Sequence, residues 1–155
     1  MRCLANIAVF VGLLVLLPER LASQTKDGAV DGAAVEYPAV WRGDWISDDG
    51  EFRYSFVLSL VQTQGSFVEG SFEWTLEEGP PAYRSRIGDA AVEWVNGREL
   101  GRRDFIVLVG HAVSDSTLIA ADAYRLVISG EAIGGSTRGN DGQWLNVLAG
   151  VRVRE

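Results

Sequence analysis

The sequence is poor in cysteine and in basic residues. Its one cysteine, Cys3, lies at the start of the chain, so no intrachain disulfide can hold the fold together. Lysine and arginine number 14 against 21 aspartates and glutamates, which gives a formal net charge of −7. Because nucleic-acid binding depends on basic side chains that neutralise phosphates, this charge argues against a nucleic-acid partner. The 155-residue chain must depend instead on burying apolar side chains, for which its length is sufficient.

Long apolar runs are also scarce, and the longest spans residues 3–17. It is too short for a membrane-spanning helix, which needs about 20 apolar residues. Arg2 before the run and a cleavage site at Leu21-Ala22-Ser23 after it are typical of a secretory signal peptide. We expect a signal peptide at 1–23, a flexible leader at 24–39 and one domain at 40–155. This organisation predicts a secreted or periplasmic protein with no membrane span after cleavage; an uncleaved anchor is the alternative.

The motifs of common catalytic and cofactor sites are missing. There is no Gly-x-Ser-x-Gly elbow and no phosphate-cradling glycine loop. The acidic loop around Asp48 lacks the ligand order of an EF-hand. The single histidine, His111, has no companion at the spacing of a zinc site, and we interpret it as structural. We therefore expect no cofactor and no metal, and an enzyme is disfavoured.

Residues 52–76 alternate between apolar and mostly polar positions. Successive side chains of a strand point to opposite faces, so this stretch predicts two strands joined by a turn at 63–66. One apolar face and one polar face are typical of an antiparallel sheet that is wet on one side. The apolar face consists of Phe52, Tyr54, Phe56, Leu58, Leu60, Val68, Gly70, Phe72, Trp74 and Leu76.

Turn signals and short apolar stretches continue to the end of the chain, with no convincing helical stripe apart from one possible turn within 114–123. The Asn96-Gly97 pair predicts a two-residue hairpin. A meander of this many strands either closes or splits into two layers. We predict an all-β fold, a single antiparallel up-and-down β-barrel of about eight strands, with a two-layer β-sandwich as the alternative. Further strands are expected near 41–47, 82–87, 90–95, 98–102, 104–113, 117–129, 132–138 and 143–153.

Two short motifs occur at the order and spacing of a known family. Gly43-Asp44-Trp45 is a Gly-x-Trp at the first strand, and Asp122-Ala123-Tyr124 is similar to the Asp-Tyr element of lipocalins. Together with the antiparallel meander, they resemble the calycin-type barrels: lipocalins, fatty-acid-binding proteins and avidin-like proteins. The resemblance implies that Arg152 or Arg154 packs over a first-strand tryptophan. It also implies a ligand inside the barrel.

The hairpin at 65–73 looks like the second hairpin of the avidin-like proteins. Phe72 and Trp74 stand where that family places a tyrosine and a serine against biotin, and they supply no hydroxyl. The resemblance therefore does not extend to biotin binding. The chain is also similar to uncharacterised secreted bacterial β-domains, which carry no function to transfer.

We expect the barrel interior to bind a small apolar or amphipathic molecule. Asp122 falls among apolar neighbours, where a carboxylate needs a partner or a proton. A structural ion pair or a turn cap at Asp122 is the alternative interpretation. The candidate ligand-binding residues are Tyr54, Phe56, Phe72, Trp74, Asp122 and Tyr124.

Two other functions stay open at this point. Exposed aromatics such as Trp94 or Trp144 would suit a protein-interaction module or an inhibitor, for which the sequence identifies no partner. Perturbed carboxylates around an open pocket would suit a barrel cyclase or isomerase, with Asp122 as the first candidate. Glu73 and Glu93 would form a catalytic pair only if the fold brings them within several ångströms of each other.

Overall fold

The computed structural model describes residues 35–101, 104–138 and 142–154. The expected signal peptide at 1–23 and most of the expected leader, 24–34, lie outside the described residues. Val35 and Tyr37, at the end of that leader, pack against the core of the barrel. In the described part of the chain, no helix has the length and hydropathy needed to cross a membrane.

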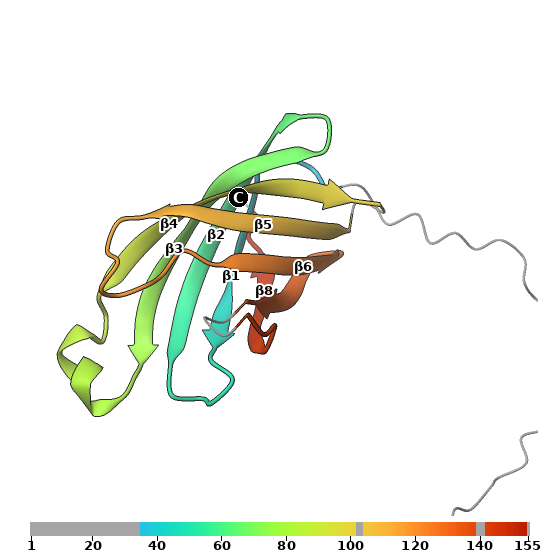
Figure 1. Ribbon diagram of the computed structural model, residues 1–155. Coiled ribbons are helices and arrows are strands. Elements are labelled where there is room, and N and C mark those ends of the chain that lie inside the picture. The colour runs from blue at the N-terminus through green and yellow to red at the C-terminus, as the bar shows by residue number, and fades with distance from the viewer. Residues whose placement is uncertain (1–34, 102–103, 139–141, 155) are drawn as a thin grey trace, which may run out of the picture. The chain divides into compact units, whose positions relative to one another are not determined.

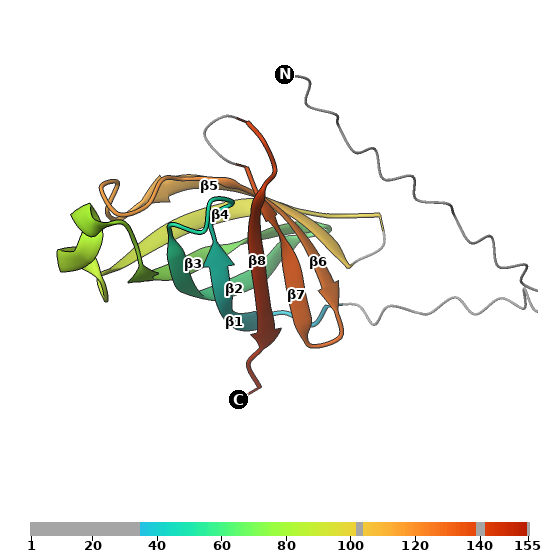
Figure 2. The same ribbon diagram turned by 90° about the horizontal axis from the view of Figure 1, so that it is seen from below.

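Eight strands form one closed antiparallel barrel in which each strand pairs with the next and β8 pairs with β1 (Figure 1). Seen from below, β8 lies between β1 and β7 and completes the ring (Figure 2). This confirms the predicted all-β up-and-down barrel over the two-layer sandwich. The strands are β1 (Ala39–Ile46), β2 (Arg53–Gln64), β3 (Phe67–Glu78), β4 (Ala90–Leu100), β5 (Phe105–Val113), β6 (Ala123–Ser129), β7 (Ala132–Thr137) and β8 (Asn146–Arg152).

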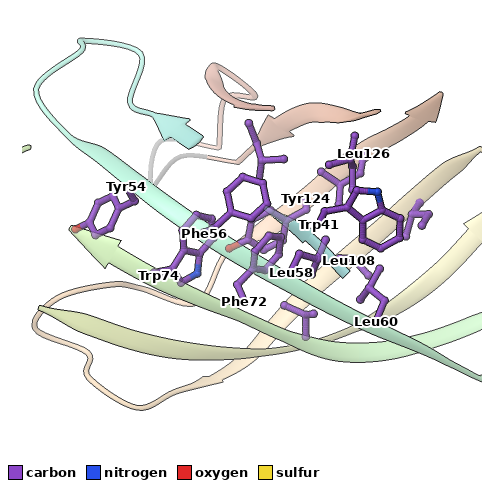
Figure 3. Close-up of a cluster of buried hydrophobic side chains, with 14 of the residues drawn as sticks. Trp41, Tyr54, Phe56, Leu58, Leu60, Phe72, Trp74, Leu108, Tyr124 and Leu126 are labelled. Carbon is purple, nitrogen blue, oxygen red and sulfur yellow. The ribbon is translucent and has the colours of Figure 1, made fainter. Parts of the chain in front are cut away.

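The alternating pattern of residues 52–76 produces the core, because β2 and β3 turn every second side chain into the barrel. Phe56, Phe72 and Trp74 pack ring against ring in the interior (Figure 3). Each fully buried side chain of this size contributes about 2 kcal/mol relative to exposure. The stack continues into a layer of leucines from four strands: Leu58, Leu60, Leu108, Leu126 and Leu148.

Several inward-facing positions hold glycine because the next strand passes too close for a side chain. A Cβ atom at Gly97 would lie 1.9 Å from the carbonyl oxygen of Val107 on β5. One at Gly135 would lie 2.0 Å from the carbonyl oxygen of Arg125 on β6. Glycine at these points lets the strands bend across the interior, and this bending closes a barrel of eight strands.

Trp41 covers the end of the barrel at which β1 begins, and its side chain is completely buried. The guanidinium carbon of Arg152 lies 5.9 Å from the centre of the Trp41 ring. The tryptophan of the Gly-x-Trp motif, Trp45, lies near the other end of β1, so the expected arginine packs over a different first-strand tryptophan. Tyr37, just before β1, donates a hydrogen bond of 2.8 Å to the carboxylate of Glu99 at the same end. Arg154 instead pairs with Glu131. This end of the barrel is therefore closed.

Three details of the sequence prediction were wrong. Residues 82–87 were expected to form a strand but belong largely to the 3₁₀ helix η1 (Pro81–Arg86), where Pro81 fixes the φ angle of the first turn. Asn96-Gly97 is not a hairpin turn but lies inside β4, where Gly97 meets β5. Residues 117–122 form a loop, and the next strand begins only at Ala123.

Candidate functional site

The other end of the barrel contains a pocket of about 280 Å³ that is open to solvent. It lies where β1, β3, β5 and β7 end, among the loops at 47–52, 79–89 and 114–122. Ligand pockets in proteins usually have volumes of about 300–1,000 Å³, so this pocket lies just below the lower end of that range and has room for only a small molecule. Its aromatic walls come from Trp45, Phe52, Tyr54, Trp74, Tyr83 and Tyr124.

The wall is held by contacts between rings from different elements. Trp45 at the end of β1 meets Tyr54 at the start of β2 edge to face, with 5.7 Å between ring centres. Phe52 in the preceding loop meets Tyr83 of η1 in the same way, at 5.1 Å. T-shaped pairs are favourable beyond the area they bury, so these contacts hold the rings of the wall against one another.

Glu93 lies at the inner end of the pocket, and none of its surface is exposed to solvent. Its position on β4 between Ala91 and Val95 turns it inward, with β3 on one side. Gly110 on β5 makes the necessary room, since a Cβ atom there would lie 1.9 Å from the Glu93 Oε1 atom. A carboxyl group this deep requires hydrogen-bond donors around it.

Three donors surround the Glu93 carboxyl group. The indole Nε1 of Trp74 donates to Oε2 at 3.1 Å, and the hydroxyl of Tyr124 donates to the same oxygen. The backbone N–H of Asp122 donates to Oε1 at 2.8 Å. We call Glu93, Trp74 and Tyr124 the floor cluster. It ties β3, β4 and β6 together at the inner end of the pocket.

Burial raises the pKa of Glu93 above its ordinary value of 4.5, and its hydrogen bonds only partly oppose the shift. The nearby charge of Asp122 raises the pKa of Glu93 further. Burial beside Glu93 raises the pKa of Tyr124 well above its ordinary value. Asp122 also has a raised pKa, chiefly because it is partly buried. The pocket therefore contains two carboxyl groups whose ionisation is penalised.

Asp122 belongs to a second group of hydrogen bonds, closer to solvent. Its Oδ1 atom accepts a hydrogen bond of 2.7 Å from the backbone of Ala123, and the Thr137 side chain also bonds to it. The Thr137 hydroxyl oxygen accepts from Trp45 Nε1 and Asn146 Nδ2, both at 3.0 Å. We call Asp122, Thr137, Trp45 and Asn146 the mouth network. It fixes the ends of β1 and β7 and the starts of β6 and β8.

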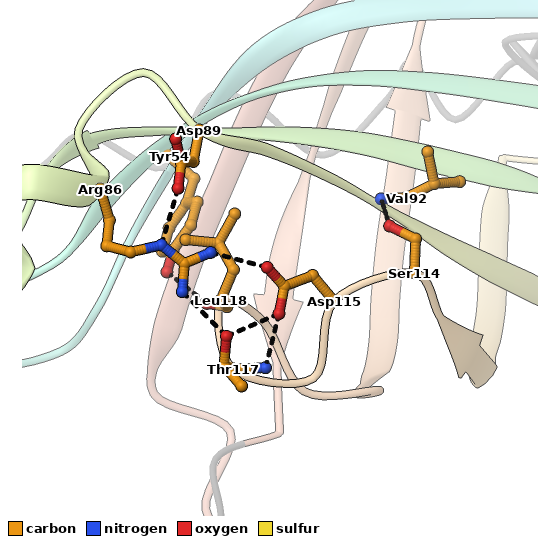
Figure 4. Close-up of polar contacts among 8 residues, drawn as sticks. All are labelled: Tyr54, Arg86, Asp89, Val92, Ser114, Asp115, Thr117 and Leu118. Carbon is orange, nitrogen blue, oxygen red and sulfur yellow. Dashed lines mark hydrogen bonds and ion pairs between the residues drawn. The ribbon is translucent and has the colours of Figure 1, made fainter.

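Arg86 of η1 joins two loops at the edge of the pocket (Figure 4). Its guanidinium group bonds to Asp89 at 2.7 Å, to Asp115 at 2.6 Å and to the hydroxyl of Thr117 at 2.8 Å. Thr117 and Arg86 lower the pKa of Asp115 to about 2, so this carboxylate stays charged at neutral pH. Arg86 therefore holds η1 against the loop at 114–122.

We expect Arg86→Ala to loosen both loops without unfolding the barrel. Ion pairs this close to solvent contribute little to global stability, whereas local opening depends on such contacts. Hydrogen exchange should increase in 79–89 and 114–122 and stay unchanged in the strands. Arg84→Ala, a change in an exposed arginine of the same helix, is the matched control. Equal exchange in both variants would contradict the role of Arg86.

Four of the six predicted site residues line the pocket: Tyr54, Trp74, Asp122 and Tyr124. Phe56 and Phe72 do not, because they lie deeper in the core, where their ring centres are 5.5 Å apart. The fold does not meet the condition for a Glu73–Glu93 pair, since Glu73 is exposed on the outer face of β3 and Glu93 is buried inside the barrel.

The sequence interpretation missed the acceptor role of Glu93 as well as Trp45, Tyr83 and Arg138, which also line the pocket. For Glu93 a signal existed, because it shares its strand phase with Ala91 and Val95. For Trp45, Tyr83 and Arg138 there was no such signal, because no sequence pattern shows which loops and strand ends meet at the open end of a barrel.

The fold and this site define the chain as a closed eight-stranded antiparallel barrel with an aromatic-walled pocket at one end. Comparisons with family models, with curated proteins and with solved structures found no match. Among the described residues, no three His, Cys, Asp or Glu side chains are grouped as metal ligands, and His111 is exposed on β5.

Proposed function

We propose that this protein is a calycin-like binding protein, secreted or periplasmic, that holds a small, partly apolar molecule in the open end of its barrel. The observation that carries the proposal is the open pocket of about 280 Å³ with aromatic walls and a polar floor. A few placed polar groups within an apolar wall are characteristic of small-molecule sites. The closed opposite end and the packed core leave the mouth as the place where a ligand enters.

Native mass spectrometry of protein purified from its own source is expected to show a retained small molecule. The residue to change is Ala121, which lines the pocket from an exposed loop position, so a large side chain there does not disturb the core. We expect Ala121→Trp to lose the retained mass while keeping the melting temperature of the parent. Ala112→Trp, at an exposed position on β5 outside the pocket lining, should keep the mass. Retention by both variants would contradict binding at this pocket.

A protein-interaction module receives less support from the structure. Such a module would show a contiguous aromatic patch, yet Trp41 and Trp74 are buried and Trp45 lies in the pocket. Trp144 is half-buried, with the guanidinium group of Arg125 4.0 Å from its ring centre. Trp94 is the exposed tryptophan, on the outer face of β4.

A barrel cyclase or isomerase is the second candidate function. It is favoured by the two carboxyl groups with raised pKa, Glu93 and Asp122, around an open pocket. If the retained molecule is a product of such a reaction, Asp122→Asn should retain the unreacted precursor. Identical retained molecules in the parent and the variant would remove this candidate.

A further inference from the structure

The polar groups deep in the pocket have their protons directed toward the protein. In the floor cluster, the indole N–H and the tyrosine hydroxyl both donate to Glu93. In the mouth network, the indole of Trp45 and the amide of Asn146 donate to Thr137, which bonds to Asp122. On the wall, the hydroxyl of Tyr54 donates to the carbonyl oxygen of Leu118 at 2.8 Å.

Although these donors are all used, the oxygen atoms of the same groups can still accept hydrogen bonds. An ionised carboxylate has about four acceptor positions. Glu93 accepts three hydrogen bonds, from Trp74, Tyr124 and the backbone of Asp122. The hydroxyl oxygens of Tyr54 and Tyr124 also keep lone pairs. Glu93 and Tyr124 are themselves buried, so the carboxyl group that a ligand reaches first is the half-buried one of Asp122. A ligand group that reaches it has to donate hydrogen bonds.

Most charged side chains in and beside the pocket are acidic. Glu93 and Asp122 face one lining cation, Arg138, whose charge and backbone N–H favour the ionised form of Asp122 while its Nε atom donates to the carbonyl oxygen of Gly142 at 3.3 Å. The adjoining loop at 47–52 carries Asp48, Asp49 and Glu51 and no basic residue. A cleft lined by one sign of charge raises the local concentration of the opposite ion.

The aromatic wall favours the same kind of ligand. Ring faces carry negative charge density and attract organic cations, the more so when those are removed from water. Trp45, Tyr54 and Trp74 line the pocket together with the two carboxyl groups. The wall therefore suits the apolar part of a ligand, and the carboxyl group of Asp122 suits a cationic donor group.

We propose that the ligand is an aromatic or aliphatic amine whose protonated nitrogen binds at Asp122, above the buried carboxyl group of Glu93, with its apolar body against the aromatic wall. This inference rests on the proposed ligand-binding function. A metal ion would require more ligands than two carboxylates, and an anion would meet repulsion at the floor.

Isothermal titration with three indole probes of similar size tests the proposal: tryptamine (cationic), tryptophol (neutral) and indole-3-acetate (anionic). We expect tryptamine to bind at least about tenfold more tightly than tryptophol, and indole-3-acetate to bind most weakly. Asp122→Asn should reduce the preference for tryptamine over tryptophol about fivefold or more. Arg138→Gln, which removes the opposing cation, should increase that preference. Glu73→Gln removes the same charge as Asp122→Asn from the outer face and should leave it unchanged.

The outcomes separate this inference from the proposal on which it rests. Binding of tryptophol or indole-3-acetate with an affinity equal to that of tryptamine would overturn the amine assignment while keeping a ligand pocket. A preference for tryptamine that survives both Asp122→Asn and Glu93→Gln would also overturn it. If none of the probes binds and the purified protein retains no small molecule, the proposed function itself fails.

Discussion

Replacing Gly135 with alanine is expected to destabilise the barrel by about 3 kcal/mol, whereas Gly134→Ala should change stability by less than about 1 kcal/mol. The two glycines are neighbours on β7 but face opposite sides of the sheet. A Cβ atom at Gly135 would lie 2.0 Å from the backbone oxygen of Arg125, so the strands must separate. At Gly134 the nearest atom would be the carbonyl oxygen of Leu148 at 3.7 Å, an ordinary contact.

Urea denaturation followed by tryptophan fluorescence measures this difference directly. For a domain of this size, a loss of 3 kcal/mol corresponds to a fall in melting temperature of roughly 10 °C. The Gly134 variant serves as the internal control, because it removes the same backbone freedom from the unfolded chain. Equal stability of the two variants would show that the close approach of β6 and β7 relaxes without cost.

Glu93→Leu is expected to be the second severe change, with a loss of about 4 kcal/mol. Leucine fills the space of the side chain but leaves the donors of Trp74, Tyr124 and the Asp122 backbone without an acceptor. Buried donors without acceptors cost about 1–3 kcal/mol each, partly offset by the removal of a buried charge. Glu73→Leu, on the exposed outer face of the neighbouring strand, is the matched control and should cost less than about 1 kcal/mol.

The pH dependence of stability gives this prediction a second readout. Burial raises the pKa of Glu93 above 4.5, so the folded protein holds this proton more tightly than the unfolded chain. The contribution of Glu93 to the free energy of unfolding is then largest below its unfolded pKa and declines as pH rises through its folded pKa. Asp122 acts in the same direction, since its pKa is raised above 3.8. Asp115, whose pKa is lowered to about 2, contributes in the opposite direction. The decline should be shallower in Glu93→Leu, and an unchanged profile would contradict a titrating Glu93.

Much of the fold follows from local alternation. The pattern of β2 and β3 fixed which residues face inward, and the number of strands made closure favourable. The wrong prediction of a turn at Asn96-Gly97 has a physical cause, which is that glycine occurs in two different settings. Glycine is common in tight turns, but it is also required where two strands approach closely, and that contact depends on the partner strand.

The site was less predictable than the core, because it depends on where strands end. Tyr54, Trp74 and Tyr124 could be assigned to the interior from alternation, while their depth relative to the mouth could not. Glu93 was ambiguous, since Val92 and Trp94 on either side are also apolar and suggest the opposite phase. The deciding fact is tertiary: Gly110 leaves the room that the carboxyl group occupies.

Trp41 and Tyr37 cover the end of the barrel opposite the pocket, which leaves one open end for a ligand. Under the proposed binding function, a ligand would enter and leave through the same open end of the barrel. The protein would then not act as a channel. The fraction of protein with an occupied pocket would follow the concentration of free ligand in solution.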